Sequence, residues 1–186
     1  MQSLEKNVTW DIVRLPKQKK PVCCKWVFKR KEGLSPSEPP RFKARLVAKS
    51  FSQIPSVDYN DVFSLVVKHT SIRTFFSIVA MHDLELEQLD VKTAFLYGEL
   101  EEEIYMDQPE GFIVPGKENY VCKLKKSLYG LKQSPRQWYK RFDSFMLSHG
   151  FKRSKYDRAV YTLRLWMDQL YTCCYMLVTC LLLPRH

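Results

Sequence analysis

Residues 86–112, LEQLDVKTAFLYGELEEEIYMDQPEGF, contain the part of the sequence that best indicates how the chain folds. Leu84–Val91, which overlaps the start of this stretch, alternates apolar and polar side chains, and that alternation is typical of a β-strand. Asp90 stands at the end of the predicted strand. An aspartate directly after a strand is usually a turn or cap residue, so any chemical role for Asp90 depends on the surrounding sequence.

The composition of the 186 residues, 45% hydrophobic and 13% aromatic, is that of a globular domain rather than a disordered chain. Thirty Lys and Arg against 20 Asp and Glu give a net charge of +10. This excess favours a polyanionic partner, because each neutralised phosphate releases condensed counterions. A merely basic surface fits the same composition equally well.

The cysteines and the C-terminal apolar run carry less information. The six cysteines contain no Cys-x-x-Cys pair that could start a zinc site, and no secretory signal precedes them, so we expect reduced thiols in an intracellular protein, cytoplasmic or nuclear. The apolar run Leu170–Leu183 has fourteen residues, whereas a membrane-spanning helix needs about 20. We therefore expect no membrane partner.

Two basic stretches, Val22–Arg30 and Arg41–Phe51, predict a β-hairpin with a long loop that contains Gly33 and three prolines. In the second strand, alternation predicts a cationic face and an apolar face: Lys43, Arg45, Val47 and Lys49 against Phe42, Ala44, Leu46 and Ala48. The cationic face suits contact with phosphates, and a plain solvated face is the alternative.

Two helices are also predicted. From a cap at Thr70 or Ser71, apolar residues recur at helical spacing and predict a helix that buries one stripe: Ile72, Phe75, Phe76, Val79 and Ala80. The second helix is predicted to begin at Ser134, with Pro135 in its first turn, and to end at Gly150. Its aromatic and apolar stripe is interpreted as packing: Trp138, Phe142, Phe145 and Met146.

Eight phrases between Thr9 and Tyr161 resemble the copia-type reverse transcriptase domain in order and spacing: TWDIVRLP, CKWVFKRK, RFKARLVAKSF, VDYNDVFS, TSIR, the stretch 86–112, VCKLKKSLYGLKQSPRQWY and SKYD. The resemblance implies an α+β fold, a partial right-hand polymerase with fingers and an incomplete palm but no thumb. It divides the chain into an N-terminal and fingers-like segment (1–70), a palm-like segment with an intervening fingers hairpin (71–162) and a tail (163–186).

The implied function is that of an RNA-directed DNA polymerase, which transfers nucleotides with two Mg²⁺ ions and acts on an RNA template, a DNA primer and dNTPs. Asp90 matches the family's first catalytic, metal-binding aspartate, with the Val91 carbonyl as a further metal ligand. The other matched positions are nucleotide-binding or contact the template and primer: Lys43 and Arg45 at the triphosphate, Phe95 under the incoming sugar, Gly130 and Gln133 at the nascent base pair, and Lys49 and Lys132 at template and primer. The strand Lys43–Lys49 is expected to face Asp90 across one cleft.

The chain departs from the family at three positions, with Ser50 and Ser56 where glycine is usual and Leu65 where proline is usual. If the glycines adopt positive φ, each serine costs roughly 1 kcal/mol.

The tail departs most. After Thr162 the resemblance predicts an apolar strand and a YVDD-type motif with the remaining catalytic aspartates, but residues 163–186 read LRLWMDQLYTCCYMLVTCLLLPRH. Asp168 is the only acid there, and we interpret it as incidental. If the codons of the tail are translated in a reading frame that starts two nucleotides later, the product can be close to DGS-x-IYLLLYVDDMLIA. The Val178 codon, however, excludes the first Asp of the pair.

We interpret the tail as out of frame, with the slip between about Thr162 and Leu165. We therefore expect the palm sheet to lose a hairpin and the chain to lack polymerase activity. A host-retained non-catalytic nucleic-acid-binding module and a small membrane-tethered protein are the alternative functions.

Overall fold

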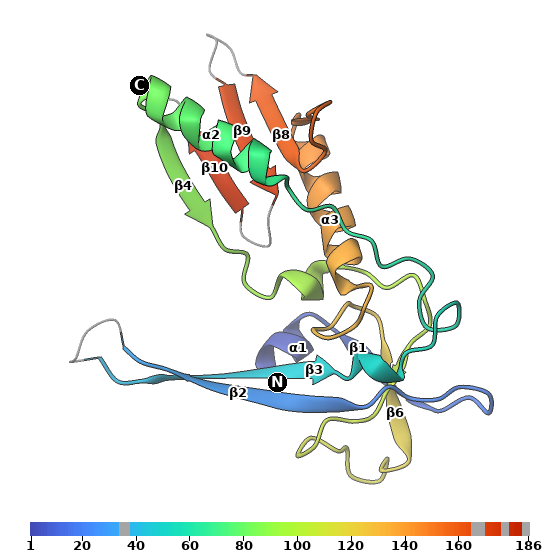
Figure 1. Ribbon diagram of the computed structural model, residues 1–186. Helices are drawn as coiled ribbons and strands as arrows, with labels where there is room; N and C mark the ends of the chain where they lie inside the picture. The colour runs from blue at the N-terminus through green and yellow to red at the C-terminus, as the bar shows by residue number, and fades with distance from the viewer. Residues whose placement is uncertain (34–37, 165–169, 176–178, 184–186) are drawn as a thin grey trace. The chain divides into compact units, whose positions relative to one another are not determined.

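The computed structural model describes residues 1–33, 38–164, 170–175 and 179–183, and it shows an α+β chain (Figure 1). The elements in chain order are α1 Gln2–Lys6, β1 Trp10–Arg14, β2 Cys24–Lys31, β3 Arg41–Ala48, η1 Ser50–Ser52, α2 His69–His82, β4 Glu85–Leu89, η2 Ala94–Tyr97, β5 Tyr105–Met106, β6 Tyr120–Leu124, α3 Ser134–Ser148, β7 Lys152–Arg153, β8 Val160–Arg164, β9 Leu170–Tyr175 and β10 Thr179–Leu183. They form two compact units, one of Met1–Phe63 with Phe95–Trp138 and one of Ser64–Ala94 with Tyr139–His186.

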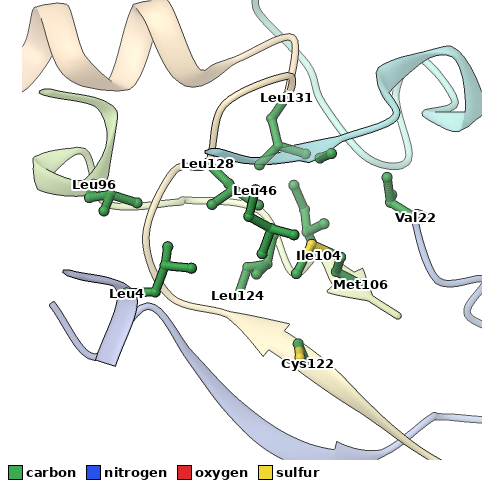
Figure 2. Packing of buried hydrophobic residues seen from close by; sticks show 11 residues of the cluster. Leu4, Val22, Leu46, Leu96, Ile104, Met106, Cys122, Leu124, Leu128 and Leu131 are labelled. Atoms are coloured by element: carbon green, nitrogen blue, oxygen red, sulfur yellow. The ribbon is translucent and has the colours of Figure 1, made fainter. Parts of the chain in front are cut away.

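The first unit contains an antiparallel sheet in the order β1-β6-β5 and the separate two-stranded hairpin of β2 and β3. Its core is drawn in Figure 2 and consists of Leu4, Val22, Leu46, Ala48, Leu96, Ile104, Met106, Cys122, Leu124, Leu128 and Leu131. These residues come from α1, from both sheets and from the connecting segments. The hairpin is thus anchored at its base by the end of β3.

The β2–β3 hairpin confirms the predicted pair of strands and their connecting loop, and Figure 1 shows it as a long two-stranded ribbon. The predicted apolar backing of β3 holds only near its end, where Leu46 and Ala48 are buried. Farther out, Phe42 on the same face is 81% exposed. Phe42 is exposed because the described core residues contact the hairpin only at its base, around Leu46 and Ala48.

The second unit contains an antiparallel sheet in the order β4-β10-β9-β8-β7. Helix α2 lies against the sheet, since residues of α2, β8 and β9 line one pocket of about 540 Å³. In the same unit, Phe142 of α3 packs edge-on against Tyr161, with ring centroids 5.6 Å apart. Asp143 accepts hydrogen bonds from the Arg153 guanidinium and from the Tyr161 hydroxyl.

The expected loss of a hairpin from this sheet was wrong. Strands β9 and β10 pair with each other, and β10 also pairs with β4, so that Thr179 lies opposite Leu89. The residues of the tail explain this result, because Leu, Tyr, Thr and Cys are compatible with a strand whichever reading frame encodes them. Asp168 lies outside the described residues.

Helix α2 begins earlier than predicted. His69 is its first residue and Lys68 its N-cap, so the predicted cap at Thr70 or Ser71 was wrong. The cap comes from a distant residue, because the Asp157 carboxylate accepts the Lys68 amide N–H (2.9 Å) and the Ser71 hydroxyl (2.6 Å). Only Phe75 of the predicted stripe is buried, and Phe76 is exposed. Helix α3, in contrast, begins at Ser134 as predicted and buries Trp138, Phe142 and Met146.

Three smaller findings complete the fold. Among the described residues, no helix is long and apolar enough to cross a membrane, and the run at 170–183 supplies β9 and β10. Cys23, Cys24 and Cys122 are free thiols, and burial raises the pKa of Cys24 to about 11 and of Cys122 to about 12. Ser56 has a φ of 63°, as expected for a glycine position, whereas Ser50 is not among the residues with positive φ.

Candidate nucleotide and nucleic-acid site

One face of the β2–β3 hairpin is cationic, and we call it the cationic face. The register places six basic residues on it: Lys25, Lys29 and Lys31 from β2, and Arg41, Lys43 and Arg45 from β3. Neither strand contains an acidic residue. The predicted cationic side of β3 is therefore extended by its partner strand, which doubles its width.

Two cross-strand pairs on this face bring like charges together. Lys29 lies directly opposite Lys43, and Lys31 lies directly opposite Arg41. Like charges at directly opposite positions destabilise a strand pair by about 0.2–1 kcal/mol each. Arg41 also pairs with the Glu38 carboxylate (3.7 Å), which offsets part of its repulsion from Lys31. The Lys29–Lys43 pair therefore carries most of an electrostatic cost that a bound polyanion would relieve.

Arg45 and Phe95, which were predicted to contact the triphosphate and the sugar, meet at Tyr129. The Arg45 guanidinium lies 5.8 Å from the centre of the Tyr129 ring, within the range of a cation–π contact. The Phe95 ring packs edge-on against the same Tyr129 ring, with the two centroids 4.8 Å apart. The sequence singled out Arg45 and Phe95 but not Tyr129, although Tyr129 belongs to the phrase YGLKQSP.

Gly130 allows β3 and the 129–130 segment to touch. Its φ is +92°, and a Cβ atom there would lie 2.1 Å from the Ala48 carbonyl oxygen. Next to it, the Ala48 amide donates to the Tyr129 carbonyl (2.7 Å). Lys49 follows β3, and its amide donates to the Cys23 carbonyl (2.8 Å), so this lysine also sits at the base of the hairpin.

Gln133 and Lys132 connect two distant segments. The fully buried Gln133 side chain accepts from the Gln53 amide (3.1 Å) and donates to the Asp58 carbonyl (2.9 Å). The Lys132 ammonium donates to the Tyr59 hydroxyl (3.0 Å). In this structure both residues brace the 53–59 loop, and their predicted contacts with nucleotide and template stay predictions. Gln53 and Tyr59 were missed because nothing in their local pattern indicates the long-range partners.

Asp90 follows β4 directly, as predicted, and its side chain is exposed. Thr93, three residues later, has a φ of 57°, a strained conformation for a β-branched residue. Asp90 belongs to the second unit and the cationic face to the first, so the expected cleft between them stays a prediction.

The metal-binding capacity near Asp90 is low in the described part of the chain, where no group of three or more His, Cys, Asp and Glu could hold a metal ion. A two-ion site needs several carboxylates around ions about 4 Å apart. Among the described residues, the predicted ligands are Asp90 and the Val91 carbonyl, which are too few for a two-ion site.

Sequence comparison decides the ancestry. A family model described as reverse transcriptase (RNA-dependent DNA polymerase) matches residues 7–180. The chain belongs to this reverse transcriptase family. No solved structure matches the chain.

Its relatives are copia-type retrotransposon polyproteins. The chain is 60% identical over 161 residues to the retrovirus-related Pol polyprotein from transposon TNT 1-94 of Nicotiana tabacum. It is 42% and 40% identical, over 171 residues each, to the corresponding polyproteins from transposons RE1 and RE2 of Arabidopsis thaliana. These alignments cover 87–91% of the chain but only 12% of each relative.

Proposed function

We propose that the chain is a reverse transcriptase fragment that binds nucleic acid through the cationic face of the β2–β3 hairpin without templated DNA synthesis. The family and the α+β fold are its starting point. Within the family's right hand, the hairpin serves as a fingers element and the sheet that contains β4 as part of the palm. The partners are then an RNA template, a DNA primer and the triphosphate of a dNTP.

The like-charged pairs of the cationic face are the observation that carries the binding proposal. The two-stranded hairpin places two like-charged pairs directly opposite each other, Lys29–Lys43 and Lys31–Arg41. Such an arrangement disfavours the free hairpin and favours a complex with phosphates. Arg45, held against Tyr129, adds a guanidinium that can form two hydrogen bonds to a phosphate.

We infer the absence of DNA synthesis from the small number of carboxylates that could bind the catalytic metal ions. Family chemistry uses divalent ions, which we take to be Mg²⁺, and Asp90 and the Val91 carbonyl are the residues of this chain that would contact one. Strand β10 begins at Thr179, which lies opposite Leu89, the residue before Asp90. In the shifted reading frame, the remaining Asp of the damaged pair is encoded across the codons of Val178 and Thr179. The chain therefore reaches the strand end that carries Asp90 where the family would place its second aspartate motif. A frame slip that removed the second aspartate motif from a palm domain explains this position of β10. The nucleotide sequence of the locus downstream of Thr162 tests the frame slip.

A charge reversal tests the binding proposal. Lys43→Glu would convert the repulsive Lys29–Lys43 pair into an attractive one, so it should weaken nucleic-acid binding while leaving the hairpin as stable as before or slightly more stable. Lys17→Glu makes the same change of charge at an exposed turn position outside the hairpin. Fluorescence anisotropy against salt concentration measures affinity and slope, and urea denaturation measures stability.

If the proposal holds, Lys43→Glu lowers affinity clearly more than Lys17→Glu. The double variant Lys43→Ala with Arg45→Ala should also reduce the salt slope by up to about 2 if both side chains contact phosphate. Equal effects of Lys43→Glu and Lys17→Glu would show that binding depends on net charge alone and that the hairpin is not the site.

A further inference from the structure

The opposite face of the same hairpin is aromatic, and the proposed function leaves it unused. The register places Trp26, Phe28 and Arg30 of β2 on it, opposite Leu46, Ala44 and Phe42 of β3. Phe28 is 76% exposed and Phe42 81% exposed. Two exposed phenylalanines on one face of a narrow ribbon are an apolar surface that folding does not bury, and such surfaces mark interaction sites. We call Trp26, Phe28 and Phe42 the aromatic face.

Contacts with neighbouring groups fix the orientation of Trp26, and Phe28 stacks on it. The Trp26 indole N–H donates to the Glu110 carbonyl (3.1 Å), and the Trp26 ring packs against Phe112 at 5.6 Å. Phe28 stacks on Trp26 with centroids 6.4 Å apart and planes 24° apart. Phe42 is the diagonal cross-strand neighbour of Phe28, because Phe28 pairs with Ala44. A fixed indole at the base therefore continues outward into two exposed rings.

The charges around these rings indicate what covers them. Arg30 lies on the same face directly opposite Phe42, and the six cations of the cationic face lie on the other side of the same ribbon. The exposed Glu32 carboxylate lies 3.5 Å from the Arg30 guanidinium, and a phosphate would have to replace this weak surface pair. Aromatic rings beside cations are the combination that binds single-stranded nucleic acid, because bases stack on the rings and cations attract the phosphates. A second copy of the chain fits this surface less well, because it would bring two strongly cationic hairpins together.

We propose that the aromatic face stacks unpaired bases of single-stranded nucleic acid, with Arg30 at a neighbouring phosphate. The inference rests on the proposed function, because the cations of the hairpin bring the strand to the rings. It adds a preference that phosphate contacts alone do not give. A duplex hides the faces of its bases, so the aromatic face selects single strands over duplexes.

The test compares two oligonucleotides of about 12 nucleotides that carry the same phosphates, one with bases and one fully abasic. Anisotropy measures the binding of each to the full chain. The wild type should bind the base-bearing strand more tightly. Phe28→Ala with Phe42→Ala should lower affinity for that strand at least about fivefold, leave the abasic strand unaffected and leave the salt slope unchanged.

Two further variants control for the fold and for general loss of apolar surface. Phe28→Tyr with Phe42→Tyr keeps both rings and should retain the preference for bases. Phe51→Ala removes a ring that is 84% exposed outside the two strands and should change neither affinity. Circular dichroism of each variant shows whether the strands are kept.

The outcomes separate this inference from the proposed function. Base stacking is overturned if Phe28→Ala with Phe42→Ala leaves both affinities unchanged or lowers the affinities for the two oligonucleotides equally. The proposed function still holds in that case if Lys43→Glu weakens binding. A wild type that binds neither oligonucleotide overturns both. If sedimentation shows a dimer that the alanine variant converts to a monomer without any loss of base preference, the aromatic face binds a second copy instead.

Discussion

Ser50 and Ser56 show how far a single residue can be interpreted without a structure. Both stand where the family usually has glycine, and sequence alone treats them alike. The structure separates them, because Ser56 has a φ of 63° whereas Ser50 begins the short turn η1 and is not among the residues with positive φ. Only Ser56 occupies a conformation that penalises a side chain.

Ser56→Gly should therefore stabilise the chain by up to about 1 kcal/mol, because glycine adopts positive φ without steric strain. Ser50→Gly is the matched control and should destabilise by about 0.5–1 kcal/mol, since glycine gains only unfolded-state entropy there. Urea denaturation of both variants measures the difference. The assignment of strain to Ser56 is wrong if Ser56→Gly is as destabilising as Ser50→Gly.

Asp157 is a second residue whose role appears only in three dimensions. Burial opposes its ionisation, but hydrogen bonds from the Ser71 hydroxyl and from the Lys68 and Ala159 amides outweigh that effect and hold the pKa of Asp157 below its ordinary value. The ionised carboxylate thus caps α2 from 86 or more residues away along the chain.

A depressed pKa fixes the sign of the pH dependence. The stability from ionised Asp157 is fully present above the unfolded pKa of about 3.9 and is lost as the pH falls through the lower folded pKa. Asp157→Asn should cost about 1.5–3 kcal/mol at neutral pH, and the difference from the wild type should shrink in acid below about pH 4. Glu85→Gln, on an exposed strand position, should stay within about 0.5 kcal/mol. A constant difference across pH, measured by denaturation at each pH, would contradict the charged cap.

At the scale of elements, periodicity predicted the β2–β3 hairpin, β4 and α3 because each repeats its pattern over several residues. It did not predict how far neighbouring elements cover a face. Alternation alone assigned Phe42 and Leu46 to the same apolar face, but Leu46 is buried and Phe42 is exposed. The tail was misjudged for a related reason, since strand formation depends on side-chain type and not on the identity of a motif.

The contact between β3 and the 129–130 segment gives an element-scale prediction. Gly130→Ala should destabilise the chain by more than about 2 kcal/mol, because it combines positive-φ strain with a clash against the Ala48 carbonyl. Gly111→Ala has a similar φ, +79°, but meets no atom within 4 Å, so it should cost only about 1–2 kcal/mol. Equal losses in thermal or urea denaturation would mean that the close approach to Ala48 contributes nothing.

For the whole molecule, the eight phrases predicted the family, and the family match over residues 7–180 confirms it. The structure brings Arg45, Phe95 and Gly130 together around Tyr129, three of the residues singled out from the sequence. It gives Gln133 and Lys132 bracing contacts that no local pattern could indicate. The roles of all the predicted site residues stay predictions, because they concern bound nucleotide, nucleic acid and ions: Lys43, Arg45, Lys49, Asp90, Val91, Phe95, Gly130, Lys132 and Gln133.

A polymerase must both bind nucleic acid and synthesise DNA, and these two requirements have different physical causes. Binding depends on summed charge, which the +10 chain retains, whereas synthesis depends on a geometry of several carboxylates. Asp90→Ala removes one negative charge and should leave binding unaltered or slightly stronger.

Primer extension tests this claim most directly. The purified chain is mixed at low salt with an RNA template, an annealed DNA primer, the four dNTPs and Mg²⁺, at a protein concentration at which anisotropy shows the primer–template to be bound. We predict full binding and no extension above that of the Asp90→Ala variant. Extension by the wild type that disappears in Asp90→Ala would contradict the account, because it would show that another carboxylate completes the metal site.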